Sequence, residues 1–334
     1  MDAPGELNRL ISGYQTSQAL HVAATLGLCD LLSDGPRGVA DLASATGAHE
    51  EALARLMRVL AAVGLVVGGD DATYANTGLG DAFRSDASRS PAARARLSGQ
   101  AFHWQAYGAL EHSIRTGESA FEAVHGESLW SHLASRPEEM AVFDDAMTAL
   151  SRGVADAVAD AYDFGRFGTV VDVGGGRGAL LGAVLARHPT VQGVLFDQPD
   201  VVASADDVLA AAGVSERCRV VGGNFFQRVP EGGDAYLLKA VIHDWPDVES
   251  VEILRTCRRA MPSDGRLLLV EQLLDQSPDP LRTALSDLTM LAIAGGTERT
   301  TDEYRALLWS AGFELVAIVS TGSEVFILEA TPAP

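Results

Sequence analysis

A glycine-rich turn between a strand and a helix constrains the fold of this chain more than any other feature. The segment VVDVGGGRG, residues 170–178, begins with β-branched residues that favour a buried strand and then runs into glycines. Glycine lets the backbone turn sharply and lets a ligand approach without a Cβ in the way. Asp197 closes the next predicted strand, where a carboxylate can accept hydrogen bonds from both hydroxyls of a ribose. The pattern predicts a nucleoside-containing cofactor, with a purely structural tight turn as the alternative.

Strand-like and helix-like segments alternate from residue 168 onward. Such alternation predicts an α/β domain with a parallel, doubly wound sheet. Two final segments, 314–319 and 324–330, are expected to pair as an antiparallel edge. The predicted strands are 169–173, 192–197, 218–222, 235–242 and 266–274, and the predicted helices are 178–188, 199–212, 247–260, 281–293 and 301–311.

The N-terminal region has a different pattern. Apolar residues recur with helical spacing in 17–33, 38–47 and 50–63, and a predicted two-stranded hairpin, 65–67 with 73–75, follows. Helices followed by a hairpin form a winged-helix pattern, which often belongs to a DNA-binding regulator. Residues 1–100 contain only about 8 basic against about 11 acidic side chains, counted along the sequence, which is a poor footprint for a nucleic acid. A packing or oligomerisation module is therefore the favoured interpretation.

Residues 92–163 show no strand pattern and predict several helices that carry aromatic side chains. These aromatic residues either belong to the core or line a ligand cavity, because such cavities are mostly apolar and aromatic. The sequence leaves both possibilities open.

Composition excludes several classes of protein. The net charge of −20, from 25 basic and 45 acidic residues, disfavours nucleic acids and anionic membrane surfaces as partners. Three cysteines without close spacing argue against a disulfide framework and against a clustered zinc site. No apolar run approaches the roughly 18 residues of a membrane span, and the start lacks the pattern of a signal peptide. We therefore expect a cytoplasmic protein.

The residues around the glycine turn favour one cofactor over another. Asp172 precedes Gly174 by two positions, so its carboxylate can reach the ammonium group of a methionine moiety, whereas a pyrophosphate would be repelled. This favours S-adenosylmethionine over a nicotinamide dinucleotide. Because Gly174, Gly176 and Ala179 also satisfy the dinucleotide pattern, a nicotinamide-dependent oxidoreductase remains an alternative.

A second motif, LLKAVIHDWPD over residues 237–247, follows an apolar strand. His243 is thereby placed at the carboxyl end of a predicted strand, the ligand side of an open α/β sheet, where it can accept a proton. One alternative is that His243 only packs while Asp244 or Asp247 caps the next helix. A metal cluster of His243, Asp244 and Asp247 is a further alternative.

Two carboxylates are expected in the same crevice. Glu271 ends an apolar strand, and Glu298 follows two glycines in a loop between predicted helices. A glutamate that is hydrogen-bonded to a histidine fixes the tautomer of the imidazole and stabilises its cation. Taken together, Glu271 and Glu298 are candidate partners of His243.

Six segments occur along the chain in the order DVGGGRG, FDQP, GGNFF, LLKAVIHDWPD, VEQLL and GGTERT. In this order they resemble the small-molecule O-methyltransferases of the plant caffeate and flavonoid type and their bacterial relatives in antibiotic and pigment biosynthesis. The resemblance covers nearly the whole chain. It implies a Rossmann-like methyltransferase sheet, S-adenosylmethionine as cofactor, no catalytic metal, and an intertwined homodimer formed through the N-terminal helices. The expected parts are a winged-helix-like dimerisation domain (1–92), a helical connector contributing to the substrate pocket (93–163) and the cofactor-binding domain (164–334).

The resemblance also implies roles for single residues. Gly174 would lie in the cofactor loop, Asp197 would bind the ribose, and Lys239 would lie beside the cofactor. Asn224 and Phe225 would contact the adenine. His243 would be the general base, flanked by Glu271 and Glu298.

One position departs from the pattern that the resemblance implies. Asn224 stands in GGNFF where an aspartate is expected. An amide oxygen still accepts a hydrogen bond from the adenine amino group, so we expect binding to survive in a weaker form. The sequence as a whole predicts methylation of a hydroxyl on an aromatic or polyketide-like molecule in bacterial secondary metabolism. Transfer to nitrogen or carbon, or a member of the fold with another reaction, remains open.

Overall fold

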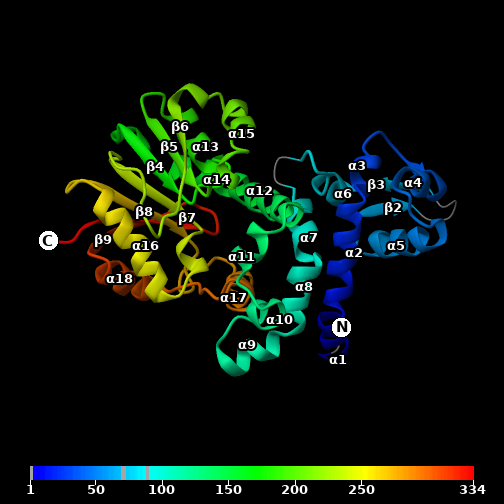
Figure 1. Cartoon of the computed structure of the whole chain (residues 1–334). Coiled ribbons are helices and arrows are strands. Elements are labelled where there is room, and N and C mark those ends of the chain that lie inside the picture. The colour runs from blue at the N-terminus through cyan, green and yellow to red at the C-terminus, as the bar shows by residue number, and fades with distance from the viewer. Residues whose placement is uncertain (1–2, 69–72, 88–89) are drawn as a thin grey trace. The chain divides into compact units, whose positions relative to one another are not determined.

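The computed structural model describes residues 3–68, 73–87 and 90–334. By their contacts these residues form two compact units (Figure 1). The first unit is built from residues 1–104 and 138–150, and the second from 105–137 and 151–334. Helices α8 (Ala101–Gly108) and α12 (Pro137–Ala161) belong to both units. The division of the chain into three parts, expected from the sequence, stays a prediction.

The first unit is mainly helical, as predicted, and contains a small sheet. Strands β2 and β3 pair antiparallel, which confirms the hairpin; most of its turn, residues 69–72, lies outside the described residues. A third strand, β1, pairs with β3 and was not predicted, because two residues are too few to show a strand pattern. The elements are α1 Ala3–Ile11, α2 Gly13–Thr25, α3 Leu28–Leu31, β1 Arg37–Gly38, α4 Val39–Thr46, α5 Glu50–Ala62, β2 Val66–Gly68, β3 Thr73–Asn76, α6 Gly78–Ala82 and α7 Ala92–Ser98.

The predicted helix 17–33 is interrupted in the structure. Gly27 has a φ of +63°, in the left-handed region that ends an α-helix, so α2 stops at Thr25 and the short helix α3 follows. Leu28 of α3 is fully buried in the same apolar cluster as Met57 and Leu60 of α5. The helical periodicity was therefore correct, but the single continuous helix was wrong.

The second unit contains a seven-stranded sheet in the order β6-β5-β4-β7-β8-β10-β9. The first five of these strands run parallel, and β10 is antiparallel to both β8 and β9, which confirms the predicted antiparallel edge. The strands are β4 Thr169–Val173, β5 Gln192–Asp197, β6 Cys218–Gly222, β7 Ala235–Lys239, β8 Arg266–Glu271, β9 Phe313–Ser320 and β10 Phe326–Pro332.

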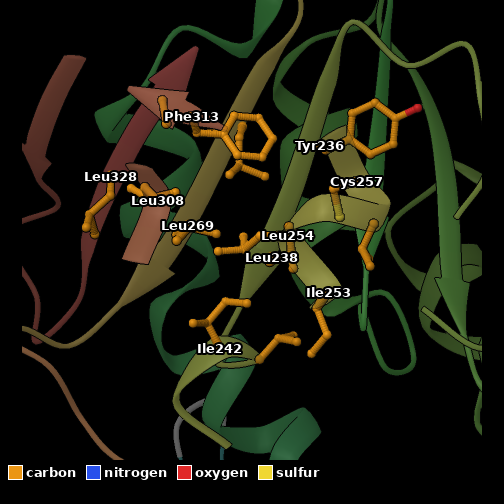
Figure 2. Packing of buried hydrophobic residues seen from close by; sticks show 14 of the residues in the cluster. Tyr236, Leu238, Ile242, Ile253, Leu254, Cys257, Leu269, Leu308, Phe313 and Leu328 are labelled. Carbon is orange, nitrogen blue, oxygen red and sulfur yellow. The ribbon is translucent and has the colours of Figure 1, made fainter. Parts of the chain in front are cut away.

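Helices cover both faces of this sheet, which makes it doubly wound. One face is buried under α13, α15 and the end of α12. The other face is buried under α16 and α18, where Leu238 and Leu269 of the sheet meet Leu254 and Leu308 of the helices (Figure 2). The helices of this unit, apart from α8 and α12, are α9 Leu110–Thr116, α10 Ala120–His125, α11 Leu129–Ala134, α13 Ala179–Arg187, α14 Pro199–Val202, α15 Asp206–Ala211, α16 Asp247–Ala260, α17 Pro280–Thr289 and α18 Thr301–Ser310.

Two predicted strands were too long, and the difference matters for the site. Strand β7 ends at Lys239, where the next residue, Ala240, has a φ of +52°, and a 3₁₀ turn follows over Ile242–Asp244. Strand β8 likewise ends at Glu271 rather than at residue 274. Apolar residues continue past both strand ends, because they stay buried in turns, and this extended the predicted pattern.

The other boundary corrections are smaller. The predicted helix 199–212 consists of two helices, α14 and α15. Helix α17 continues into a π-helix over Met290–Ala294, a conformation that often occurs at functional sites. None of the helices in the described parts of the chain is both long and apolar enough to span a membrane.

Candidate active site

The carboxyl ends of four neighbouring strands bring the predicted site residues to one edge of the sheet. Gly174 follows β4, Asp197 ends β5, Lys239 ends β7 and Glu271 ends β8. These four strands are adjacent, in the order β5-β4-β7-β8. Ligands of open α/β sheets bind at this edge, so the positions agree with those expected from the sequence.

The glycine turn has a backbone that only glycine adopts readily. Gly174 has a φ of +71°, and a Cβ there would lie 2.7 Å from Cγ2 of Val241. The amide of Gly176 donates to Oδ2 of Asp197 at 2.8 Å. Asp197 therefore fixes the turn as well as standing at the strand end.

Asp172 is a buried carboxylate at the foot of this turn. It is 1% exposed, and neither of its oxygens has a hydrogen-bond partner among the described residues. Burial raises the pKa of Asp172 to about 7, against the opposing effect of the Lys239 charge. A buried carboxylate without partners is costly, and a ligand that carries an ammonium group would relieve that cost. The two unpartnered oxygens of Asp172 can accept hydrogen bonds from the ammonium group at the amino-acid end of S-adenosylmethionine, so this residue fits the cofactor.

The residues expected at the adenine lie after β6. Oδ1 of Asn224 accepts the amide of Phe226 at 2.9 Å, so this side chain stabilises its own loop. Phe225 is half-buried, and its ring packs edge-to-face against Trp245, with the ring centroids 6.0 Å apart. The GGNFF segment and the turn after His243 are therefore in contact.

His243 and Glu298 form the central pair of the site. Nδ1 of His243 lies 3.1 Å from Oε1 of Glu298. The side chain of Glu298 is fully buried and that of His243 is 13% exposed. Nε2 of His243 lies 3.6 Å from Oδ1 of Asp244, beyond hydrogen-bond distance. With Nδ1 donating to Glu298, Nε2 is the nitrogen left to accept a proton.

Glu271 holds the backbone of the turn that carries His243. Its Oε1 accepts the amides of Val241 at 3.2 Å and Ile242 at 3.0 Å. Its Oε2 lies 3.6 Å from Nδ1 of His243. Burial raises the pKa of Glu271 to about 7, although the charge of His243 opposes this. Glu271 thus anchors the turn and adds negative charge beside the imidazole.

The charges around His243 decide its protonation. Burial lowers the pKa of this imidazole, but the carboxylates of Glu271, Asp244 and Glu298 outweigh that effect and raise it to about 10. In the protein without ligands, His243 is therefore an imidazolium at neutral pH. It becomes a base only after it gives up this proton.

Several residues that support the pair had no assigned role in the sequence analysis. The hydroxyl of Ser286 donates to Oε1 of Glu298 at 2.8 Å, and Nε2 of Gln272 lies 3.3 Å from the same oxygen. Asp287 accepts the amide of Glu298 at 2.9 Å. Gln272 lies in the VEQLL segment, so the sequence offered a reason to consider it. Ser286 and Asp287 lie on α17, outside the six recognised segments, so no sequence motif indicated them.

The geometry of Asp247 does not support the helix-capping alternative. Asp247 begins α16 without capping it, and its carboxylate binds Arg299 at 2.8 Å. In the described parts of the chain, the group with spacing suited to a cation is His243 with Glu271 and Glu298, each offering one atom within 4.8 Å of the others. Because His243 and Glu298 already share a hydrogen bond, metal-free chemistry stays our prediction.

Comparison with known proteins gives two family matches that cover most of the chain. Residues 107–314 match the family model described as O-methyltransferase domain. Residues 8–86 match the model described as O-methyltransferase dimerisation domain.

Curated relatives extend over nearly the full length. The phenazine O-methyltransferase PhzM of Lysobacter antibioticus is 42% identical, over 98% of this chain and 95% of the relative. The mitomycin biosynthesis 6-O-methyltransferase of Streptomyces lavendulae is 40% identical, over 95% of this chain and 91% of the relative. An 8-amino-8-demethylriboflavin N,N-dimethyltransferase of Streptomyces davaonensis is 38% identical, over 93% and 90%.

Solved structures agree with this grouping. The crystal structure of LaPhzM superposes with a TM-score of 0.95 at 42% identity, covering 99% of this chain and all of the other. The O-methyltransferase NcsB1 from neocarzinostatin biosynthesis, in complex with S-adenosylmethionine and 2-hydroxy-5-methyl naphthoic acid, gives a TM-score of 0.82 at 36% identity over 95% and 96%. With its glycine turn, its catalytic-domain match and its dimerisation-domain match, this chain belongs to the S-adenosylmethionine-dependent O-methyltransferase family.

Proposed function

We propose that this enzyme methylates a hydroxyl group of an aromatic or polyketide-like small molecule in bacterial secondary metabolism, with His243 as the general base. The hydrogen bond between Nδ1 of His243 and Oε1 of Glu298 carries this proposal. It orients the imidazole and leaves Nε2 at the ligand edge of the sheet. The names of the O-methyltransferase relatives support an aromatic acceptor.

The cofactor supplies an electrophilic methyl group, and the residues of this chain supply the binding and proton chemistry. Asp197 would hold the ribose, Asp172 the ammonium group, and Asn224 with Phe225 the adenine, while Lys239 lies among them. Alignment of the acceptor oxygen with the methyl group provides much of the rate enhancement.

His243 removes the proton of the acceptor hydroxyl as its oxygen becomes the nucleophile. Such general-base assistance is typically worth about 10²–10⁴-fold in rate. Because the surrounding carboxylates hold the free imidazole in its charged form, His243 first releases the proton on Nε2 to solvent and keeps the one on Nδ1 in the bond to Glu298. Glu298 and Glu271 then stabilise the imidazolium that forms when the acceptor proton is taken up.

Transfer to nitrogen is the second candidate function. It is favoured by one relative named as an N,N-dimethyltransferase, which shares 38% of its sequence with this chain. An amine acceptor that binds unprotonated needs no base at its attacking atom. Loss of His243 would then leave most of the rate.

The test uses the full-length protein with a panel of acceptors. We expect S-adenosylhomocysteine, and not NAD, to raise the melting temperature, because its amino-acid ammonium group suits the buried carboxylate of Asp172, whereas NAD carries a pyrophosphate instead. The panel contains 1,4-dihydroxy-2-naphthoic acid, 3-amino-4-hydroxybenzoate and an aminonaphthalene, with the methylated atom identified by mass spectrometry and NMR. The proposal is supported if a phenol is methylated on oxygen and if His243→Ala lowers the rate of this reaction about 10²-fold or more. The affinity for the cofactor should stay within a few-fold of the wild type. Stabilisation by NAD alone, or an undiminished rate in His243→Ala, contradicts it.

A further inference from the structure

We propose that Arg299 is a positioning residue that fixes the backbone of the turn carrying His243. The inference rests on the proposed role of His243 as the base. Arg299 stands in the GGTERT motif, directly after Glu298. It is 2% exposed, and a charged guanidinium is buried only where several groups satisfy it.

The guanidinium donates to the carbonyls on both sides of His243. Nη1 of Arg299 donates to the carbonyl oxygen of Ile242 at 3.1 Å, and Nη2 donates to that of Trp245 at 2.9 Å. These two carbonyls precede and follow the base in the chain. The planar, forked guanidinium holds them at a fixed separation, which a single ammonium group does not do.

The first turn of α16 completes this arrangement. Asp247 accepts hydrogen bonds from Nε of Arg299 at 3.1 Å and from Nη2 at 2.8 Å. The hydroxyl of Ser250 lies 3.2 Å from the carbonyl oxygen of Ile242 and 3.1 Å from that of Trp245. The single hydroxyl proton of Ser250 is thus shared between the two carbonyls that Arg299 binds, and Asp247 neutralises the charge of Arg299.

Three consecutive residues act on the same turn. The amide of Thr297 donates to the carbonyl of His243 at 2.8 Å, Glu298 binds the imidazole, and Arg299 binds the flanking carbonyls. Gly296 lies so close that a Cβ there would be 2.1 Å from the carbonyl oxygen of His243. The segment 296–299 thus lies directly against the turn and fixes both its backbone and its side chain.

Internal bonds alone hold the turn weakly. Within it, the amide of Asp244 donates to Val241 at 3.2 Å and that of Trp245 donates to Ile242 at 3.3 Å, both at the long end of the normal range. Without Arg299 the carbonyls of Ile242 and Trp245 would keep only these bonds and the hydroxyl of Ser250, so the backbone on both sides of His243 would be less firmly held. Displacement of a catalytic group by about 1 Å costs on the order of 10²-fold in rate. Arg299 should therefore affect catalysis and not cofactor binding.

The experiment compares Arg299→Met with a matched control, Arg217→Met. Arg217 also donates to backbone carbonyls, at 2.6 Å to Leu185 and 2.9 Å to Val191, but it lies before β6, at the amino end of the parallel strands. In Arg299→Met we expect kcat on the best panel acceptor to fall about 10- to 100-fold, with KM and the Kd for S-adenosylhomocysteine within about 3-fold. Arg217→Met should lower the melting temperature and leave kcat within about 3-fold. An equal loss of kcat in both variants overturns the inference.

The decisive step repeats Arg299→Met in the His243→Ala background. If Arg299 acts through His243, adding Arg299→Met to His243→Ala lowers kcat by less than about a further 3-fold, because there is no base left to position. Equal fold-losses in both backgrounds overturn the inference while leaving the base intact. If His243→Ala alone keeps the full rate, the proposed base fails, which is a separate result.

Arg299→Met could lose activity because it misfolds, so a second variant and a spectroscopic measurement test the inference independently. Asp247 is exposed at 76% of its side chain, so Asp247→Asn should fold and loosen the guanidinium; we expect a smaller loss of kcat that also disappears in His243→Ala. The Nδ1–H proton of His243 can be observed by ¹⁵N-edited NMR in the absence of any methyl-acceptor substrate. It should shift or broaden in Arg299→Met and stay unchanged in Arg217→Met, and an unchanged signal in Arg299→Met contradicts the inference.

Discussion

His243 and Glu298 lie 55 positions apart in the chain and are joined by one hydrogen bond, 3.1 Å from Nδ1 to Oε1. His243 comes from the turn after β7, and Glu298 from the loop between the π-helix and α18. The pair gives the imidazole a defined direction.

The two glutamates should differ in importance. Glu298→Gln removes the charge that stabilises the imidazolium at Nδ1, so we expect kcat to fall about 10²-fold or more. Glu271→Gln keeps an oxygen that can accept the amides of Val241 and Ile242, and we expect a loss below about 10-fold. Steady-state kinetics with saturating cofactor measure both. A larger loss in Glu271→Gln would contradict this division of roles.

His243 should stabilise the fold in a pH-dependent way. Its pKa rises from 6.5 to about 10 on folding, so the folded form keeps a proton that the unfolded form has lost. The stabilisation is complete below pH 6.5, shrinks as the pH rises, and is lost above about pH 10. Melting temperatures of the wild type and His243→Ala should therefore converge between pH 7 and pH 10, each measured in buffers of equal ionic strength. A gap that widens with pH would show that the sign is wrong.

Asn224 should limit the affinity for the cofactor. Asn224→Asp keeps the oxygen that accepts the amide of Phe226 and adds a charge for the adenine amino group. Charge-assisted hydrogen bonds are roughly twice as strong as neutral ones, so we expect S-adenosylhomocysteine to bind about 3- to 10-fold more tightly. Isothermal titration calorimetry of both proteins checks this. Weaker binding by the aspartate variant would place the adenine elsewhere.

The N-terminal helices should form a homodimer. Helix α1 has no buried residue, and Leu10 and Ile11 are 60% and 69% exposed. A second copy would cover this face with an isologous interface above roughly 2,000 Å². Deletion of residues 1–20 should therefore give a monomer in light scattering and lower the activity. The point variant Ile11→Glu should shift the equilibrium in the same direction, and a fully active monomer at micromolar concentration would contradict the prediction.

Chelation should leave the activity unchanged. Prolonged dialysis against EDTA removes bound divalent ions, whereas the proposed base needs only its carboxylate partners. The rate on the best panel acceptor, measured before and after dialysis, gives the answer. A loss that magnesium restores would assign the cluster of His243, Glu271 and Glu298 to a cation.

The sequence by itself determined the segments proposed to bind the cofactor. The strand, the glycine turn and Asp197 are specified by local patterns, since each depends on the residue types of one short segment. The sequence did not locate the end of β7, because Val241 and Ile242 are as apolar as the strand before them. Only the structure shows that Ala240 turns the chain out of the sheet.

The arrangement around the proposed base, His243, was decided by tertiary structure. The sequence nominated His243, Glu271 and Glu298 as a group, but only packing shows that Glu298 binds Nδ1 while Glu271 binds the backbone. The supporting residues Ser286 and Arg299 come from segments 43 and 56 positions away from His243 in the sequence. Hydrogen bonds between distant segments depend on how helices and strands pack, and no period or spacing along the chain records that geometry.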